Sequence, residues 1–589
     1  MHRQYPVKKV ILESMTLTAT TLSGPVVPTT AGDVRGLLDE DRELMTWRGV
    51  PFGADTSGAH RFSAPRPAQP WTGVRDCVDF GTPAPQPTYS LNDAVAGSED
   101  CLHLDIVRPA THATLPVVVY LHGGSFLMGA SHQRLLRGYE MALGMDVVYV
   151  SVNFRLGALG YLDYRSVPLS EDDEPCVANP AIHDQLLALE WVRDNVAEFG
   201  GDPDNVTLMG ESAGGAAVTT LMCVPAAEGL FHRAIAQSPP VASIHSRAQS
   251  TMWIRDLLAG LDVDDTAAED ITLGDLRDLD AAELVRAGQT MLFQGRELMH
   301  LNPCFSPTVD GELLPDHPFE AFAAGDQMKI PLVIGSNLDE IGFSRFMYQR
   351  SKKRGSVARQ LLKVFDPLAA PGVLEAYDGG VQRKDFADLL SDAVFWAPAV
   401  RVAEAHSQWA PTWLYRFDYA PQLLRWLGLG AMHSLELSVI FGDPGAHRAV
   451  NFAKYGGLGG LEEVMETMQY EWAHFFHTGG VAPDWPEYVT DSRLGEKRAT
   501  MIFNVESEVV HDPEPEKRVA WEGFDLTEWG VGRPDLLAEL GLLAEVAAGD
   551  RPEDVDGEAD EVAAAPEPGS PGKDAGTRGL WSALRRRRG

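Results

Sequence analysis

The stretch NVTLMGESAGGAAVTTLM, residues 205–222, decides the fold of this chain. Val206 to Met209 favour a β-strand, and the small residues after Ser212 are compatible with a helix. Glycines two positions before and after Ser212 permit a sharp strand-to-helix turn, because a side chain at either position would collide with neighbouring backbone. The pattern predicts a nucleophile elbow that exposes the Ser212 hydroxyl, with the amide of Ala213 available at the helix N-terminus for a developing oxyanion. A flexible glycine-rich loop is the alternative for so short a motif.

A second glycine-rich turn follows another predicted strand. The run LPVVVYLHGGSFLMG, residues 115–129, is continuously apolar from Leu115 to Leu121 and then enters His122-Gly123-Gly124-Ser125. Backbone amides in such a turn can approach a substrate closely. Gly124 and Ser125 are therefore predicted to donate to the same oxyanion as Ala213, with a simple β-turn as the alternative.

Apolar runs alternate with helical stretches along most of the chain, which argues for an α/β fold: a mostly parallel central sheet with helices on both faces. Residues 1–15 are predicted to be an N-terminal extension, and residues 16–548 the catalytic domain. Residues 549–589 are rich in proline, glycine and acidic residues, end in a short basic cluster, and are predicted to be disordered.

Six further segments strengthen this interpretation. With the two glycine motifs, the chain resembles the type-B carboxylesterase family of the α/β-hydrolase fold from about Val34 to His511 in TWRGVPFG, SEDCLHLDI, VNFRLGALGYL, DQLLALEWVRDNVAEFGGDPDNV, LFHRAIAQS and FSPTVDGELLP. The resemblance implies a serine hydrolase that acts on small-molecule carboxylic esters through an acyl-enzyme, without a metal or organic cofactor. It also implies large lid insertions between Ser212 and His433.

The same resemblance assigns the partners of Ser212. The catalytic acid is Glu340 in IGSNLDEIGF, where Ile341 is inserted before the glycine that follows the acid in the family. The base is His433 in LGLGAMHSLELSVIFGD, where Ser434 replaces the usual glycine. The chain order Ser, Glu, His is the order expected for this fold.

Other positions are also interpreted through the resemblance. Ser125 replaces a glycine or alanine, keeps the amide donor, and is predicted either to narrow the space beside the scissile carbonyl or to point away from it. His122 is expected to shape the oxyanion turn without relaying protons. Two ion pairs are expected to hold loops in place: Arg48 with Glu99, and Arg155 with Asp184.

Composition limits the possible partners and compartment. The chain has 49 Lys and Arg against 84 Asp and Glu, a net charge of -35. Such acidity argues against a nucleic-acid partner. The N-terminus has no long apolar run, and no segment is long and apolar enough for stable membrane insertion, so a cytoplasmic enzyme is expected. The oligomeric state, monomer or homodimer, stays open.

Cysteine usage fits a reducing compartment. Cys101 is the one cysteine at a family disulfide position, and Ala84 occupies the place of its partner. No family disulfide is therefore expected, and a Cys77–Cys101 pair is the alternative.

Two other functions compete with general ester hydrolysis. A choline-ester hydrolase would carry a choline-binding tryptophan in the loop before SEDCL, but PTYSLNDAVAG has none. A catalytically silent adhesion protein of the neuroligin kind would lack the nucleophile and carry a membrane anchor. Both alternatives fit the sequence less well than a carboxylesterase.

Overall fold

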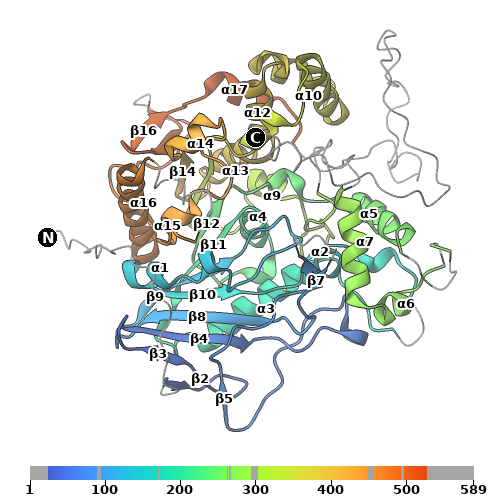
Figure 1. The fold of residues 1–589 in the computed structure, drawn as a ribbon, viewed down its shortest axis with the longest axis vertical. Helices are drawn as coiled ribbons and strands as arrows, with labels where there is room; N and C mark the ends of the chain where they lie inside the picture. Colours follow the sequence, from blue (N-terminus) through green and yellow to red (C-terminus); the bar gives the residue numbers. More distant parts are fainter. Residues whose placement is uncertain are drawn as a thin grey trace, which may run out of the picture. The chain divides into compact units, whose positions relative to one another are not determined.

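The two glycine motifs lie at the ends of neighbouring parallel strands in the computed structural model of the chain (Figure 1). Strand β9 (Leu115–Leu121) has the bounds that its apolar run predicts, and β11 (Gly201–Glu211) ends one residue before Ser212. The structure describes residues 24–88, 94–169, 173–261, 263, 267–268, 270–293, 303–446, 456–491 and 496–526.

An 11-stranded sheet forms the centre of the molecule. Its order is β16 (Glu508–His511), β15 (Ala499–Phe503), β14 (Thr412–Phe417), β13 (Leu332–Asn337), β12 (Arg233–Gln237), β11, β9, β10 (Val148–Val152), β8 (His103–Pro109), β4 (Leu44–Pro51) and β3 (Leu37–Asp39). The strands from β15 to β10 pair in parallel, whereas the pairs at both edges are antiparallel. The predicted mostly parallel sheet is confirmed.

Both faces of this sheet are covered. On β9, Val118 and Tyr120 belong to a core cluster that also contains residues of α1 (Tyr139–Met145), α15 (Leu437–Ile440) and α16 (Leu458–Thr478). Successive side chains of a strand point to opposite faces. The alternate residues Val117 and Val119 are nevertheless fully buried as well. Helices α3 (Pro180–Asn195), α4 (Ala213–Leu221) and α13 (Ala397–His406) also contact the sheet.

Insertions between Ser212 and His433 form a helical lid region. Its helices are α5 (Arg247–Ala259), α6 (Leu273–Asp278), α7 (Ala281–Phe293), α9 (Pro318–Ala324), α10 (Ser351–Phe365), α11 (Ala370–Ala376) and α12 (Arg383–Ser391). The short helix η6 (Gly342–Phe346) follows β13, and the π-helical turn η8 (Asp392–Trp396) joins α12 to α13. Near the end of the described chain, α17 (Pro515–Glu522) packs against α11 and α13.

One of the two expected ion pairs forms and the other does not. Arg155 and Asp184 pair in the core, with Nη2 and Oδ1 2.7 Å apart. The predicted Arg48–Glu99 pair is wrong, because the guanidinium of Arg61 holds the Glu99 carboxylate at 2.6 Å and 2.7 Å.

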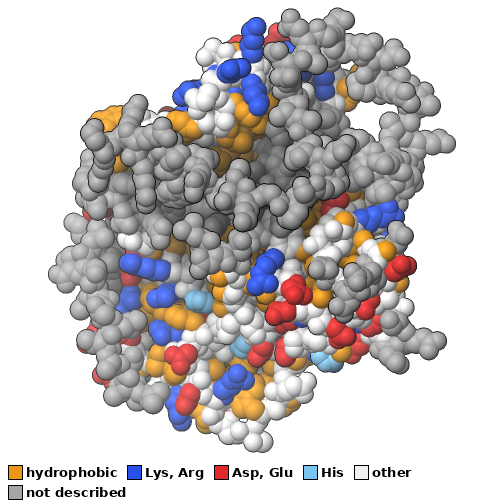
Figure 2. All heavy atoms as spheres, turned by 45° about the vertical axis from the view of Figure 1, so that its right-hand side comes forward, with side chains coloured by type: hydrophobic (Ala, Val, Ile, Leu, Met, Phe, Trp, Pro, Cys, Tyr) orange, Lys and Arg blue, Asp and Glu red, His pale blue; other side chains and the backbone are white. Residues whose placement is uncertain are grey.

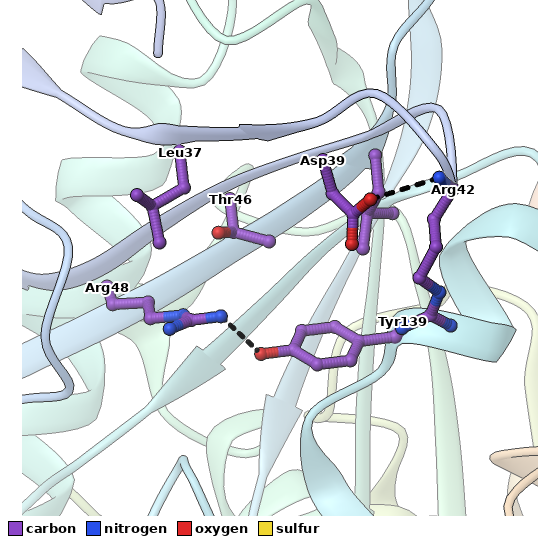
Figure 3. Close-up of a pocket in the computed structure, with 7 residues that line it drawn as sticks. Leu37, Asp39, Arg42, Thr46, Arg48 and Tyr139 are labelled. Carbon is purple, nitrogen blue, oxygen red and sulfur yellow. Dashed lines mark hydrogen bonds between the residues drawn. The ribbon is translucent and has the colours of Figure 1, made fainter. Parts of the chain in front are cut away.

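Arg48 has other partners because β4 directs it towards the start of α1. It donates to the hydroxyl of Tyr139 at 3.0 Å, beside a small pocket (Figure 3). Its guanidinium also lies over the ring of Phe80, 4.7 Å from the centroid.

The structure bears on the expectations about disulfides and membrane spans, but not on those about the two ends of the chain. None of the five cysteines, which all lie within the described residues, forms a disulfide, Cys77 and Cys101 included. Among the described helices, none has the length and apolar character needed to cross a bilayer. Residues 1–15 and the tail 549–589 lie outside the described residues, and so does part of the PTYSLNDAVAG loop.

Candidate active site

Ser212 occupies a strained turn between β11 and α4. Its φ of 58° and ψ of -125° lie outside the regions that ordinary residues populate, a feature that clusters at functional sites. The side chain sits at the N-cap of α4 without capping the helix, so the hydroxyl is not used to hold the turn. These are the properties that the glycine-flanked motif predicts for an elbow.

The flanking glycines are required by close backbone contacts. A Cβ at Gly210 would lie 2.5 Å from the carbonyl carbon of Gly214, and one at Gly214 would lie 2.0 Å from the carbonyl oxygen of Leu121. The second contact joins the elbow to the end of β9. The two glycine motifs are thus parts of one packed unit.

The predicted oxyanion donors lie around this elbow. Gly124 has a φ of 124°, and Ser125 follows with a φ of 55°. In the hydrogen bonds of the described residues, the amides of Gly124, Ser125 and Ala213 donate to no protein acceptor. A Cβ at Gly123 would lie 3.1 Å from the Cβ of Ser212, which places the turn directly beside the candidate nucleophile. Amides placed this way suit an incoming anionic oxygen.

His433 and Glu340 meet as the sequence predicts. Their Nδ1 and Oε2 atoms are 2.6 Å apart, and Glu340 is buried. The other oxygen of Glu340 accepts bonds from the hydroxyl of Ser238 at 2.6 Å and the amide of Asn337 at 2.7 Å. The inserted Ile341 leaves the acid in place, since its amide donates to the Ser391 hydroxyl at 2.9 Å.

Glu211 is a member of the site that the sequence reasoning missed. Its Oε1 lies 3.2 Å from Nε2 of His433 and accepts a 2.5 Å bond from the hydroxyl of Ser434. Within the described residues, no hydrogen bond joins that ring nitrogen to the hydroxyl of Ser212. The signal that could have revealed Glu211 is its position inside the elbow motif, where a charged side chain next to the nucleophile has to face the site or solvent.

Glu436 brings a third carboxylate to this buried cluster. It accepts bonds from the side-chain amides of Asn337 at 2.6 Å and Gln237 at 3.2 Å. Burial, and then the charges of Glu211 and Glu340, raise the pKa of Glu436 to about 8. This shift favours the protonated form of Glu436, because three buried carboxylates beside one histidine repel one another.

The carboxylates change the acidity of the base. Burial alone would lower the pKa of His433, but Glu211 and Glu340 outweigh burial and raise that pKa to about 10. Burial raises the pKa of Glu211, while His433 and the bond from Ser434 oppose this shift. A carboxylate at each ring nitrogen is an arrangement that stabilises an imidazolium.

Phe395 completes the surroundings of His433. The two ring centroids are 4.5 Å apart, and Phe395 is buried on the π-helical turn η8. His122, by contrast, is buried with its ring stacked on Phe154, and burial lowers its pKa to about 4. The described residues contain no group of three or more His, Cys, Asp or Glu side chains arranged to hold a metal ion.

The model of the carboxylesterase family matches residues 23–521. The chain belongs to this family. It is 34% identical over 504 residues to the para-nitrobenzyl esterase of Bacillus subtilis, with 84% of this chain and 97% of that protein covered. It is 32% identical over 486 residues to phenmedipham hydrolase of Pseudarthrobacter oxydans, with 80% and 94% covered.

Solved structures agree with this membership. A PNB esterase structure superposes with a TM-score of 0.73 at 32% identity and covers 85% of this chain and 99% of its own. A carboxylesterase of Geobacillus stearothermophilus superposes with a TM-score of 0.70 at 31% identity, with 84% and 99% covered. This carboxylesterase therefore has the α/β-hydrolase fold and is a carboxylic-ester hydrolase, as the sequence predicts.

Proposed function

We propose that the enzyme hydrolyses small carboxylic esters by a Ser212-His433-Glu340 triad through an acyl-enzyme. The observation that carries the proposal is the 2.6 Å contact between His433 and Glu340 beside a strained Ser212 elbow. His433 takes the proton of the Ser212 hydroxyl as its oxygen attacks the ester carbonyl, and Glu340 holds the ring in one tautomer. The resulting imidazolium faces a carboxylate at each nitrogen.

The tetrahedral oxyanion is bound by the amides of Gly124, Ser125 and Ala213, each contributing about 3 kcal/mol by comparison with other oxyanion holes. His433 returns its proton to the departing alcohol. The same histidine then activates a water that hydrolyses the acyl-Ser212 ester to the free acid. Neither step needs an added cofactor.

We infer that the substrate is a small-molecule ester, because the relatives include proteins named para-nitrobenzyl esterase and liver carboxylesterase. The cytoplasmic location, the oligomeric state and the division into residues 1–15, 16–548 and 549–589 stay predictions. A choline-ester specificity has no described tryptophan to support it in residues 87–88 and 94–97 of the relevant loop.

The test is covalent labelling with an organophosphate followed by mass spectrometry. We expect the adduct on Ser212, and we expect Ser212→Ala to lower kcat by a factor on the order of 10⁴ to 10⁶ with an unchanged melting temperature. Ser243→Ala is the matched control, because that buried serine donates to the carbonyl of Pro240 and lies outside the elbow. An adduct on any other serine contradicts the proposal.

A further inference from the structure

A run of cations directly follows the candidate catalytic acid. Residues 341–365 contain no Asp or Glu, in a chain where acidic residues outnumber Lys and Arg by 84 to 49. They carry seven cations: Arg345, Arg350, Lys352, Lys353, Arg354, Arg359 and Lys363. The segment forms η6 and α10 and packs against α12.

Two of these cations serve the fold. Arg345 pairs with Asp339 at 2.5 Å and donates to the carbonyl of Gly428 at 2.6 Å. Arg354 is buried and donates to the carbonyls of Val381 and Tyr348. Neither guanidinium is available to a partner.

The other five cations are exposed, and none forms an ion pair with a described carboxylate; they are Arg350, Lys352, Lys353, Arg359 and Lys363. Asp388 on the neighbouring α12 forms an ion pair with Lys384. The short helix η7 (Asp378–Gly380) packs on α10 and carries one exposed acidic residue, Asp378. Figure 2 shows Lys and Arg side chains beside hydrophobic ones at the top of the molecule, where Figure 1 places α10 and α12.

Three large apolar side chains project from the same segment. Phe343, Phe346 and Met347 are 54%, 49% and 43% exposed, although they belong to a folded helical turn. The apolar residues of α10 behave differently, since Val357 and Leu361 are buried against the protein. The projecting side chains therefore have no described core to cover them.

We propose that these eight residues, Phe343, Phe346, Met347, Arg350, Lys352, Lys353, Arg359 and Lys363, form a basic lid surface that binds an anionic lipid bilayer. Lysines and arginines around projecting Phe and Met side chains combine attraction to anionic headgroups with apolar insertion at the interface. The phosphates of a nucleic acid could pair with the Lys and Arg side chains. A nucleic acid would not provide an apolar environment that buries the three projecting side chains. The anionic headgroups repel the acidic remainder of the chain, and this repulsion orients the basic lid surface towards the lipid.

Binding would bring the segment that follows Glu340 to the bilayer, where apolar esters dissolve. Lipid binding by this surface depends on its charge and exposure and not on the proposed triad. Its experiment measures lipid binding, whereas hydrolysis of a soluble ester serves only to show that each variant is folded.

The test is co-sedimentation of the full chain with vesicles of phosphatidylcholine containing one quarter phosphatidylserine, and with pure phosphatidylcholine, in about 0.1 M salt. Lys352→Glu/Lys353→Glu should weaken binding to the anionic vesicles at least about tenfold. Arg134→Glu/Lys497→Glu is the matched control, because these cations are 63% and 41% exposed elsewhere and the net charge changes equally. A second variant, Phe346→Ser, should also weaken binding while hydrolysis of a soluble ester is unchanged.

The basic C-terminal cluster needs its own control. A full chain with Arg585 to Arg588 replaced by serine should bind the anionic vesicles like the wild type. The proposal is overturned if no anionic vesicle binding occurs, if the lysine variant binds normally, or if only the C-terminal variant loses binding. Binding of a DNA duplex that is tighter than vesicle binding and is lost in the lysine variant would assign the surface to a polyanion and also overturn it.

Discussion

Ser434 links two parts of the site that are far apart in the sequence. It follows His433, adopts a φ of 64°, and holds the carboxylate of Glu211 at 2.5 Å. Glycine, the residue that the family pattern has at this position, adopts such a φ more easily but cannot make that bond. The strain at Ser434 is therefore compensated by a contact that fixes Glu211 beside Nε2 of His433.

This contact predicts a shift in the pH dependence of catalysis. The base must be neutral, so its raised pKa places the acid limb of kcat/KM above the ordinary histidine range near 6.5. Ser434→Ala removes a bond that lowers the pKa of Glu211, so more Glu211 is neutral and the imidazolium loses a stabilising charge. The acid limb should move to lower pH, and further still in Glu211→Gln.

Full pH–rate profiles of both variants test this expectation, with Ser438→Ala as the control, since among the described residues the hydroxyl of Ser438 bonds only the carbonyl of Leu435. An acid limb that stays in place in Ser434→Ala would show that the serine only fills space.

Ser125 predicts a steric limit on the alcohol group of the ester. This residue is exposed and has a φ of 55°, two residues after Gly123, where an added Cβ would lie 3.1 Å from the Cβ of Ser212. Ser125→Gly should raise kcat/KM for tert-butyl acetate more than for n-butyl acetate, because the amide donor stays while the side chain is removed. Ser125→Ala separates the two parts of the side chain, since it keeps the Cβ and loses the hydroxyl. Equal losses on both esters would instead make the hydroxyl an oxyanion donor.

At the scale of elements, the π-helical turn η8 places Phe395 against the base. A π-helical turn is wider than an α-helical one, so η8 changes which side chains of the helix face the site. Such turns are frequent at functional sites. Phe395→Leu should lower kcat by about tenfold, because the imidazole loses a ring that restricts its orientation.

Phe386→Leu is the control for this prediction, because Phe386 is also buried, on α12, but its ring packs against Tyr348. Both variants should lose about 1 kcal/mol of stability, and only Phe395→Leu should lose kcat. Equal kcat in the two variants would remove any positioning role from η8.

Elements with a strong local signal were predictable from the sequence, and contacts between distant residues were not. The strand 115–121 is a continuous apolar run and needs no tertiary information. Glu340 and His433 were found through motifs, although 93 positions separate them. Glu211 and Ser434 are 223 positions apart, so nothing local signals their bond. The Arg48–Glu99 pair failed for the same reason, since Arg61 competes for Glu99 only in the folded chain.

At the scale of the whole molecule, the end of the chain divides into a part that packs and a part predicted to be dispensable. The last described helix, α17, is tied to the lid region: Lys517 pairs with the buried carboxylate of Asp392 at 3.1 Å, and the indole of Trp521 donates to the hydroxyl of Tyr377 at 2.8 Å. The family match ends at residue 521. These contacts make α17 part of the catalytic domain.

Truncation after Ala548 should therefore leave hydrolysis of a p-nitrophenyl ester and the melting temperature nearly unchanged, because a charged, proline- and glycine-rich segment cannot bury enough apolar surface to order itself. Truncation after Asp512 is the contrasting variant. It removes α17 and leaves Asp392 buried without the lysine that compensates its charge, so the melting temperature should fall by several degrees. If removal of residues 549–589 lowered the melting temperature as much as removal of α17, the tail would have to pack on the catalytic domain.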